Sequence, residues 1–150
     1  MYRIYIERKP GFQNEAERLF SELSDFLGIK SLKSLRYLNR YDIENVQDAI
    51  AEKASIRIFS EPQSDSVFFT HIPLNPEDTV IAWEYLPGQY DQRSDSAQQC
   101  ISLLQAEITK ESAETPLVKC AKLVILQGSI SLDEIEKIKK YLINPVDSQE

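Results

Sequence analysis

Glycine, cysteine and histidine are scarce in this chain, whose 150 residues include 4 glycines, 2 cysteines and 1 histidine. With so few glycines there is no G-x-G-x-x-G motif and no P-loop, and the sequence offers no glycine-rich cradle for a nucleotide. A zinc site needs about four cysteine or histidine ligands in close spacing, whereas the residues of these types are scattered here. His71 has no serine or cysteine beside it in a recognisable catalytic frame, and we expect no catalytic role for it.

The two cysteines are interpreted as small buried hydrophobic residues rather than as a disulfide. Cys100 falls in an apolar stripe with helical spacing, and Cys120 falls in an apolar stretch that is typical of a strand. No apolar run approaches the ~20 residues of a membrane span, and the first residues lack the apolar core of a signal peptide. We therefore expect a soluble, cytoplasmic protein with no membrane partner.

Acidic side chains outnumber basic ones, 24 to 17, which gives a net charge of −7. The excess is uneven: residues 1–75 hold 10 basic and 11 acidic side chains, and residues 76–150 hold 7 and 13. Since such a surface repels phosphate backbones, nucleic acid is not expected as a partner. A hydrophobic fraction of 42% with 27% charged residues is ordinary for a folded domain of this length.

Hydrophobic patterns divide the chain into two series of elements in the same order. Apolar residues alternate with polar ones in the predicted strands and recur every three or four positions in the predicted helices. A connector rich in proline and serine separates the two series and contains a short predicted strand at 67–69. The first series (strand, helix, strand, helix) covers residues 1–9, 14–27, 35–43 and 45–54, and the second covers 79–85, 97–104, 118–127 and 131–142.

Matching strand ends and matching helix caps in the two series support a duplication. The first strand of each series ends at a proline-glycine pair, Pro10-Gly11 or Pro87-Gly88, and Asn45 and Ser131 are the predicted caps of the second helices. We therefore predict an α+β fold in which duplicated β-α-β-α units form a pseudo-dimer, with antiparallel sheets and helices packed on one face of each. A single domain would span residues 1–150, with the first repeat, connector and second repeat at 1–59, 60–78 and 79–143.

The same alignment makes Leu23 and Leu104 equivalent positions in the apolar stripes of the two first helices. We expect both leucines in the core, where truncation to alanine costs about 2–5 kcal/mol of stability. Arg40 and Lys110 are expected at the surface, where truncation changes stability by no more than about 0.5 kcal/mol.

Residues 86–100 (LPGQYDQRSDSAQQC) form the most distinctive segment, at a predicted turn from strand to helix. Ser94, Asp95 and Ser96 can satisfy the free N–H groups at the start of the helix, but the other polar side chains exceed what capping needs. Two interpretations are open: an elaborate surface turn in which Arg93 pairs with a neighbouring aspartate, or a docking or substrate-proximal loop. The candidate contact residues are Gln89, Tyr90, Asp91, Gln92, Arg93 and Asp95.

Residues 86–100 resemble a signature near the N-terminus of large, single-chain phosphoribosylformylglycinamidine synthases. The resemblance continues almost from end to end, except near residues 63–77 and 105–118. The other stretches that look like the same family are YIERKPGF (5–12), LNRYD (38–42), FSEP (59–62) and KKYLINPV (139–146).

Membership of this family implies an amidoligase of purine biosynthesis, which uses ATP, Mg²⁺ and glutamine to convert formylglycinamide ribonucleotide into the amidine. The N-terminal domain of such enzymes resembles a fused dimer of the small separate subunit found in multi-subunit versions. The implied partners are the synthetase and glutaminase domains of the same polypeptide, and no cofactor or metal is expected within residues 1–150. The resemblance implies a non-catalytic domain that aligns the two catalytic units and helps enclose ammonia transfer.

Two other classes of function stay open. One is a free-standing, ferredoxin-like regulatory module that binds a small ligand between its two halves. The other is an independent enzyme in which Asp91, Arg93 and Asp95 act as acid, base and clamp. Cys100 is not interpreted as a glutaminase nucleophile, because it lies inside a helical stripe rather than at a tight strand-to-helix turn.

Overall fold

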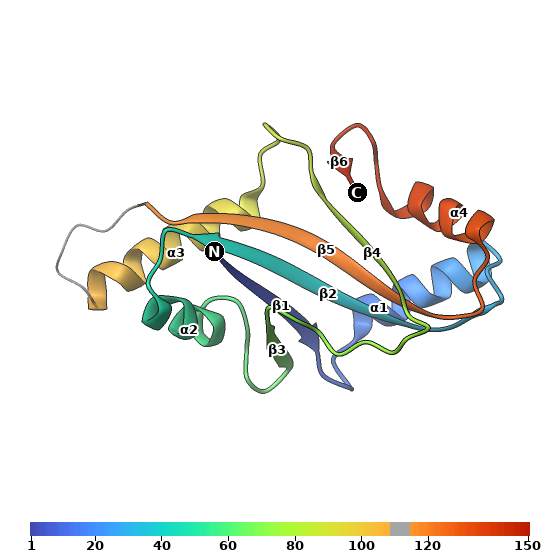
Figure 1. Ribbon diagram of the computed structural model, residues 1–150, viewed down its shortest axis with the longest axis horizontal. Helices are drawn as coiled ribbons and strands as arrows, with labels where there is room; N and C mark the ends of the chain where they lie inside the picture. Colours follow the sequence, from blue (N-terminus) through green and yellow to red (C-terminus); the bar gives the residue numbers. More distant parts are fainter. Residues whose placement is uncertain (109–114) are drawn as a thin grey trace.

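An antiparallel sheet forms the centre of the protein (Figure 1). The computed structural model describes residues 1–108 and 115–150, and six strands of this part form the sheet in the order β3-β1-β2-β5-β4-β6. The two longest strands, β2 and β5, pair along their length at the middle of the sheet. The strands are β1 (Tyr2–Arg8), β2 (Leu32–Glu44), β3 (Asp65–Phe69), β4 (Thr79–Tyr85), β5 (Leu117–Gly128) and β6 (Ser148–Gln149).

The helices of the described residues pack on one face of this sheet. Figure 1 shows α2 and α3 over one end of the sheet and α1 and α4 over the other. Helix α1 leads directly into a five-residue π-helical turn, η1 (Glu22–Phe26). The helices are α1 (Asn14–Ser21), α2 (Asp48–Arg57), α3 (Gln92–Ile108) and α4 (Leu132–Leu142).

Two hydrophobic clusters lie between the sheet and the helices, one beneath each pair of helices. They form because alternate strand residues point to the same face of a sheet, where they meet the apolar stripes of the helices. The cluster beneath α2 and α3 includes Ile4, Ile6, Tyr41, Ile43, Ile50, Ala54, Ile101 and Leu104. The cluster beneath α1 and α4 includes Leu19, Leu23, Leu35, Ile81, Val124, Leu126 and Ile138.

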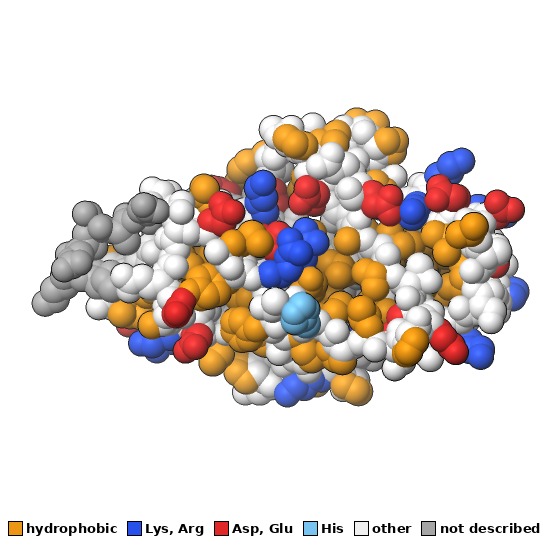
Figure 2. Space-filling model, in the orientation of Figure 1, with side chains coloured by type: hydrophobic (Ala, Val, Ile, Leu, Met, Phe, Trp, Pro, Cys, Tyr) orange, Lys and Arg blue, Asp and Glu red, His pale blue; other side chains and the backbone are white. Residues whose placement is uncertain are grey.

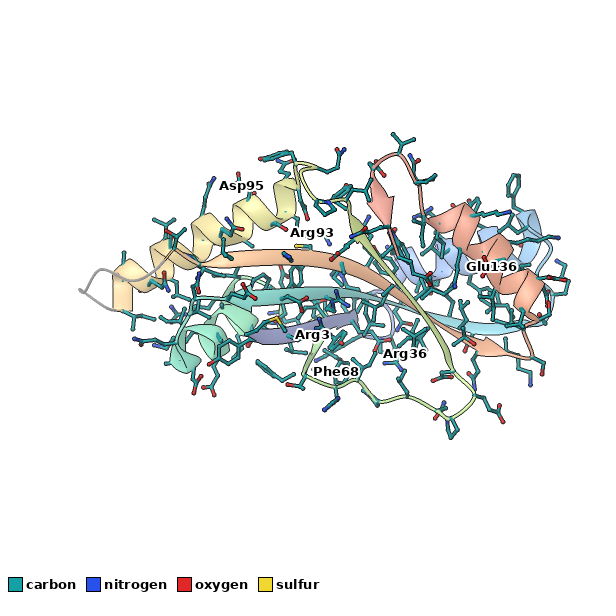
Figure 3. The ribbon with its side chains drawn as sticks, turned by 45° about the horizontal axis from the view of Figure 1, so that its top comes forward. Arg3, Arg36, Phe68, Arg93, Asp95 and Glu136 are labelled. Atoms are coloured by element: carbon teal, nitrogen blue, oxygen red, sulfur yellow. The ribbon has the colours of Figure 1, made fainter. Side chains whose placement is uncertain are left out.

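The part of the connector that follows β3, residues 70–78, partly covers the opposite face of the sheet. Arg36 of β2 holds it there: its guanidinium donates to the Glu7 carboxylate at 2.7 and 2.8 Å and to the Pro73 carbonyl at 2.7 Å. Arg3, Arg36 and Phe68 mark this side of the central strands in Figure 3. The third cluster, beneath the connector, is formed by Tyr5, Leu38, Leu123 and Ile125 with Phe68, Ile72 and Ala82.

The predicted α+β class and the antiparallel pairing are confirmed, and the sheets predicted for the two units are joined into one by β2 and β5. Leu23 and Leu104 are 0% and 6% exposed, as expected for core residues. The expectation for Arg40 is wrong, because its side chain is 19% exposed and one guanidinium nitrogen lies 3.6 Å from the Asp42 carboxylate. Lys110 lies outside the described residues.

One predicted helix start is also corrected. Asn45 has a φ of 65° and follows β2 in a left-handed turn, and α2 begins three residues later, at Asp48. The capping box at Ser131 is confirmed, since its hydroxyl accepts from the Glu134 N–H at 3.2 Å while the Glu134 carboxylate accepts from the Ser131 N–H at 3.1 Å.

Candidate functional site

The distinctive loop, residues 86–91, joins β4 to α3 and lies beside the segment that follows α4. The Leu86 N–H donates to the Asp147 carbonyl at 2.8 Å, and β6 pairs with the end of β4. Tyr90 in the loop is 72% exposed, and Val146 in the neighbouring segment is 77% exposed. Figure 2 shows hydrophobic side chains gathered where these two segments rise from the sheet. Two parts of the chain far apart in sequence therefore form one surface.

Asp91 is the residue that caps helix α3. One carboxylate oxygen accepts from the N–H groups of Arg93 and Ser94, at 3.0 and 3.3 Å, and the other accepts from the Ser94 hydroxyl at 2.8 Å. The expectation that Ser94, Asp95 and Ser96 satisfy these N–H groups is therefore wrong. A carboxylate in this position also interacts favourably with the positive end of the helix dipole.

Asp95 fixes the loop from inside the helix. Its carboxylate accepts from the Tyr90 hydroxyl at 3.1 Å and from the Gln99 side-chain amide at 3.2 Å. The hydrogen bond to Asp95 raises the pKa of Tyr90, since it stabilises the protonated phenol. Asp91 and Asp95 thus both contribute to the rigidity of the turn.

The side chain of Arg93 reaches across to the sheet and pairs with neither Asp91 nor Asp95. Its guanidinium donates to the Asn39 side-chain carbonyl at 2.5 Å, 54 residues earlier in the chain. Figure 3 shows Arg93 and Asp95 at the start of α3, on the other side of the central strands from Arg3 and Arg36. In the interpretation as an elaborate surface turn, the pairing of Arg93 with Asp91 or Asp95 is therefore wrong, and the side chain instead connects the loop to β2.

Buried phenols line the strand beneath Arg93. Burial raises the pKa of Tyr37 to about 12, the charge of Glu15 adds to this shift, and the Arg93 charge opposes it. Burial likewise raises the pKa of Tyr41, against the effect of Arg93. Both phenols therefore stay protonated at neutral pH and offer hydroxyl groups rather than charges.

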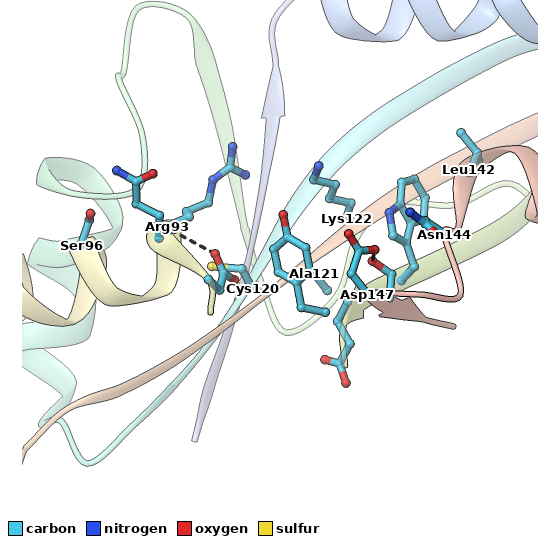
Figure 4. Close-up of a pocket in the computed structure, with 14 residues that line it drawn as sticks. Arg93, Ser96, Cys120, Ala121, Lys122, Leu142, Asn144 and Asp147 are labelled. Carbon is cyan, nitrogen blue, oxygen red and sulfur yellow. Dashed lines mark hydrogen bonds between the residues drawn. The ribbon is translucent and has the colours of Figure 1, made fainter. Parts of the chain in front are cut away.

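A pocket of about 640 Å³ opens beside Arg93 (Figure 4). Its volume lies within the range of small-molecule sites. The wall combines two aromatic rings with cationic, anionic and amide groups, which are types of group that can bind and orient a small molecule. The residues that line it are Trp83, Glu84, Tyr85, Asp91, Gln92, Arg93, Ser96, Cys120, Ala121, Lys122, Leu142, Asn144, Asp147 and Ser148.

The six candidate residues lie on one turn but differ in how they are engaged. Asp91, Arg93 and Asp95 each bind a different partner within the domain, so they do not converge as an acid, a base and a clamp. Gln89, Tyr90 and Gln92 are exposed. Within residues 1–108 and 115–150, the side chains of Gln89 and Gln92 have no hydrogen-bond partner, and no group of three histidine, cysteine or acidic residues could hold a metal ion.

Local sequence patterns do not mark the parts of this surface that other elements supply. Asn39 and Asn144 fall in stretches that carry the family resemblance, which is the only signal that marked them. Lys122 and Asp147 gave no signal, because their proximity to the loop depends on the pairing of β4 with β5 and β6. A local pattern shows which face of a strand is apolar, but it does not show which distant strand will be the neighbour.

The two thiols of this region differ in exposure, and the expectation that Cys100 is buried is wrong because it lies on the exposed side of α3. Cys120 is half-buried under the Ser94 hydroxyl, and burial raises its pKa to about 11. We expect iodoacetamide at pH 8 to alkylate Cys100 at least about tenfold faster than Cys120, since only the thiolate reacts. Peptide mass spectrometry over time measures both rates, with Cys100→Ser as the control; equal rates would contradict the burial of Cys120.

No protein-family model, no curated protein and no solved structure matches this chain. Among the helices of the described residues, none is both long enough and apolar enough to cross a membrane.

Proposed function

We propose that this chain is the non-catalytic N-terminal domain of a cytoplasmic phosphoribosylformylglycinamidine synthase of purine biosynthesis. The support is the resemblance of five separate stretches, in the right order, to that family. In the complete enzyme, ATP, Mg²⁺ and glutamine serve the conversion of formylglycinamide ribonucleotide into the amidine, and other domains of the polypeptide bind them. The role of this domain is to align the glutaminase and synthetase domains and to help enclose ammonia transfer.

The observation that carries this role is the loop between β4 and α3. Gln89, Tyr90 and Gln92 are exposed on a turn that the Asp91 cap and the bond from Arg93 to Asn39 hold rigid. Polar side chains on a loop fixed by a rigid scaffold are suited to contact a partner, because little conformational entropy is lost on docking. We assign this loop to contacts with the catalytic domains of the same polypeptide, which is positioning rather than bond chemistry.

We also infer that the two halves arose by duplication, as in a fused dimer. Support comes from the strand order, which reads β2-β1-β3 from the centre to one edge and β5-β4-β6 to the other. Ile4 of β1 pairs with Tyr41, and Ile81 of β4 pairs with Val124. If Ile4 and Ile81 are equivalent positions of the two halves, Tyr41 and Val124 are equivalent as well. The offset in sequence from Tyr41 to Val124 also relates Asn39 to Lys122. Because Asn39 and Lys122 pair with each other, the pseudo-twofold axis passes beside them.

An assay of the complete protein tests the proposed function. We expect it to form the amidine from formylglycinamide ribonucleotide with ATP, Mg²⁺ and glutamine, and we expect residues 1–150 alone to give no turnover. Chromatographic detection of the amidine with glutamine as the nitrogen donor gives the answer. A complete protein without this activity would contradict the proposal.

The pocket beside Arg93 favours a second candidate, a small-ligand-binding module. Its wall offers the rings of Trp83 and Tyr85 together with the cations Arg93 and Lys122, a combination suited to an anionic ligand with a flat or apolar body. Thermal unfolding of the 150-residue protein against a panel of metabolites tests this candidate. A saturable rise in Tm that Lys122→Ala abolishes would support it, and no shift with any member of the panel would count against it.

A further inference from the structure

The outer edge of β4 is only partly paired. On its inner side β4 pairs with β5 from Thr79 to Glu84, whereas on its outer side β6 pairs only with Glu84 and Tyr85. In the described ranges of the chain, no strand pairs with the outer edge between Thr79 and Trp83. At the other side of the sheet, β3 pairs with five residues of β1, from Ile4 to Arg8. The two outer strands therefore differ in how much of their neighbour they cover.

The unpaired edge presents backbone groups that are ready to bond. Alternate residues of a strand direct their N–H and C=O groups to opposite sides. Since the Leu86 N–H donates to the Asp147 carbonyl on the outer side, the backbone groups of Glu84, Ala82 and Val80 face the same side. Val80 and Ala82 thus offer two donors and two acceptors along one line.

This edge also lacks the features that prevent edge strands from pairing with a further strand. Natural edge strands carry charged residues, prolines or bulges that prevent further pairing. The free stretch of β4, Thr79-Val80-Ile81-Ala82-Trp83, has neither a charged residue nor a proline, and Val80 is 41% exposed. The outer strand β3, by contrast, begins with Asp65. The composition of β4 suits a strand that is covered on both sides.

The direction and register of β6 indicate what would cover it. β6 runs antiparallel to β4, with Ser148 opposite Tyr85 and Gln149 opposite Glu84. The same register carried forward puts Glu150 opposite Trp83, position 151 opposite Ala82 and position 153 opposite Val80. The Glu150 carboxylate lies 3.0 Å from the Lys139 ammonium of α4, which fixes the direction of the chain along the edge. A segment that continues from Glu150 needs no further turn to reach the free groups.

We propose that the outer edge of β4 is the docking site of the peptide segment that follows Glu150, which extends β6 along Val80–Trp83. This inference rests on the proposed function, in which the polypeptide continues into further domains. The proposal predicts an extended segment without proline at positions 151 and 153, whose N–H groups would bond to β4. In the register of β6, position 152 would lie opposite Ile81 on the helix face, where Ile81 and Ile138 are buried, and an apolar side chain is expected there.

Amide hydrogen exchange tests the proposal by comparing the complete protein with a form that ends at Glu150. We expect the amides of Val80 and Ala82 to exchange at least about 100-fold more slowly in the complete protein, because each gains a ladder hydrogen bond. The amides of Ile81 and Trp83, which face β5, serve as the internal control and are expected to be protected in both forms. Equal exchange of Val80 and Ala82 in the two forms would overturn the proposal.

Two proline variants separate edge pairing from general stability. Ala82→Pro removes only an outward N–H, a position at which edge strands tolerate proline, so the 150-residue form is expected to keep its cooperative unfolding. In the complete protein the same variant is expected to return Val80 to fast exchange. Ile81→Pro removes a ladder bond to β5 and is expected to destabilise both forms. Unchanged slow exchange of Val80 in the complete Ala82→Pro protein would contradict docking at this edge.

Other outcomes of the same experiment are also decisive. Protection of Val80 and Ala82 in the 150-residue form that disappears on dilution would mean that a second copy occupies the edge, and the proposal would be wrong. Amidine formation by a complete protein with an unprotected edge would overturn this inference alone. A protected edge in a complete protein without that activity would overturn only the proposed function.

Discussion

Replacing Leu104 by alanine is expected to lower the free energy of unfolding by about 2–5 kcal/mol. The side chain is 6% exposed and packs in the cluster beneath α2 and α3, together with Ile50 of the neighbouring helix. Its removal leaves a cavity between helix and sheet that the surrounding strands cannot fill without moving. Urea unfolding followed by circular dichroism measures the change as a shift of the midpoint at constant m-value.

Leu103 provides a matched control one position earlier in the same helix. It is 73% exposed, so the same substitution there removes almost no buried surface. We expect Leu103→Ala to change stability by no more than about 0.5 kcal/mol. Leu23→Ala, in the other cluster, is expected to behave like Leu104→Ala because Leu23 is fully buried. Equal midpoints for the Leu103 and Leu104 variants would contradict the packing of α3.

In the complete protein, Arg93→Ala is expected to weaken glutamine-dependent amidine formation much more than formation from free ammonia. If the loop docks on a catalytic domain, the guanidinium becomes a buried, charged hydrogen-bond partner, and losing such a partner typically costs about 2–5 kcal/mol. If the proposed function is correct, that cost would affect the alignment of the glutaminase and synthetase sites and would leave the synthetase chemistry with external ammonia untouched. Initial rates with the two nitrogen donors, measured side by side, give the ratio.

Asn39→Ala is the control for the fold, because it removes the partner of Arg93 within the domain and leaves the guanidinium in place. If Arg93 acts only as a surface residue of the turn, its loss should cost less than about 1 kcal/mol, and both activities should survive. An equal loss with both nitrogen donors would mean that Arg93 serves the fold or the synthetase chemistry. Either result would contradict the coupling role.

Much of the fold follows from local patterns in the sequence. The Ser131 capping box, the buried positions Leu23 and Leu104 and the antiparallel α+β class are all found in the structure. These features depend on periodicity and on helix-end chemistry, which act over a few residues. The left-handed conformation of Asn45 does not follow from the sequence, because asparagine suits both a helix cap and a turn with positive φ.

Features that depend on distant segments were not predictable in the same way. The joining of all strands into one sheet depends on the pairing of β2 with β5. Strand β6 is only two residues long, which is too short for an alternating pattern to mark it. Arg40 is a charged residue that the sequence alone places at the surface, but in the sheet it lies between Tyr5 of β1 and Ala121 of β5, and its side chain is 19% exposed. Arg93 had two aspartates close in sequence, yet it bonds to Asn39 because α3 begins directly over the middle of β2.

Site-specific photo-cross-linking from the loop tests the central claim most directly. A benzophenone amino acid replaces Gln89, an exposed residue whose side chain has no hydrogen-bond partner in the described part of the chain, within the complete protein. We expect cross-links to peptides beyond residue 150, in the glutaminase or synthetase domain, and none from the same probe at the exposed position Glu52 of α2. Cross-links from position 89 that stay within residues 1–150 would contradict the docking role of the loop.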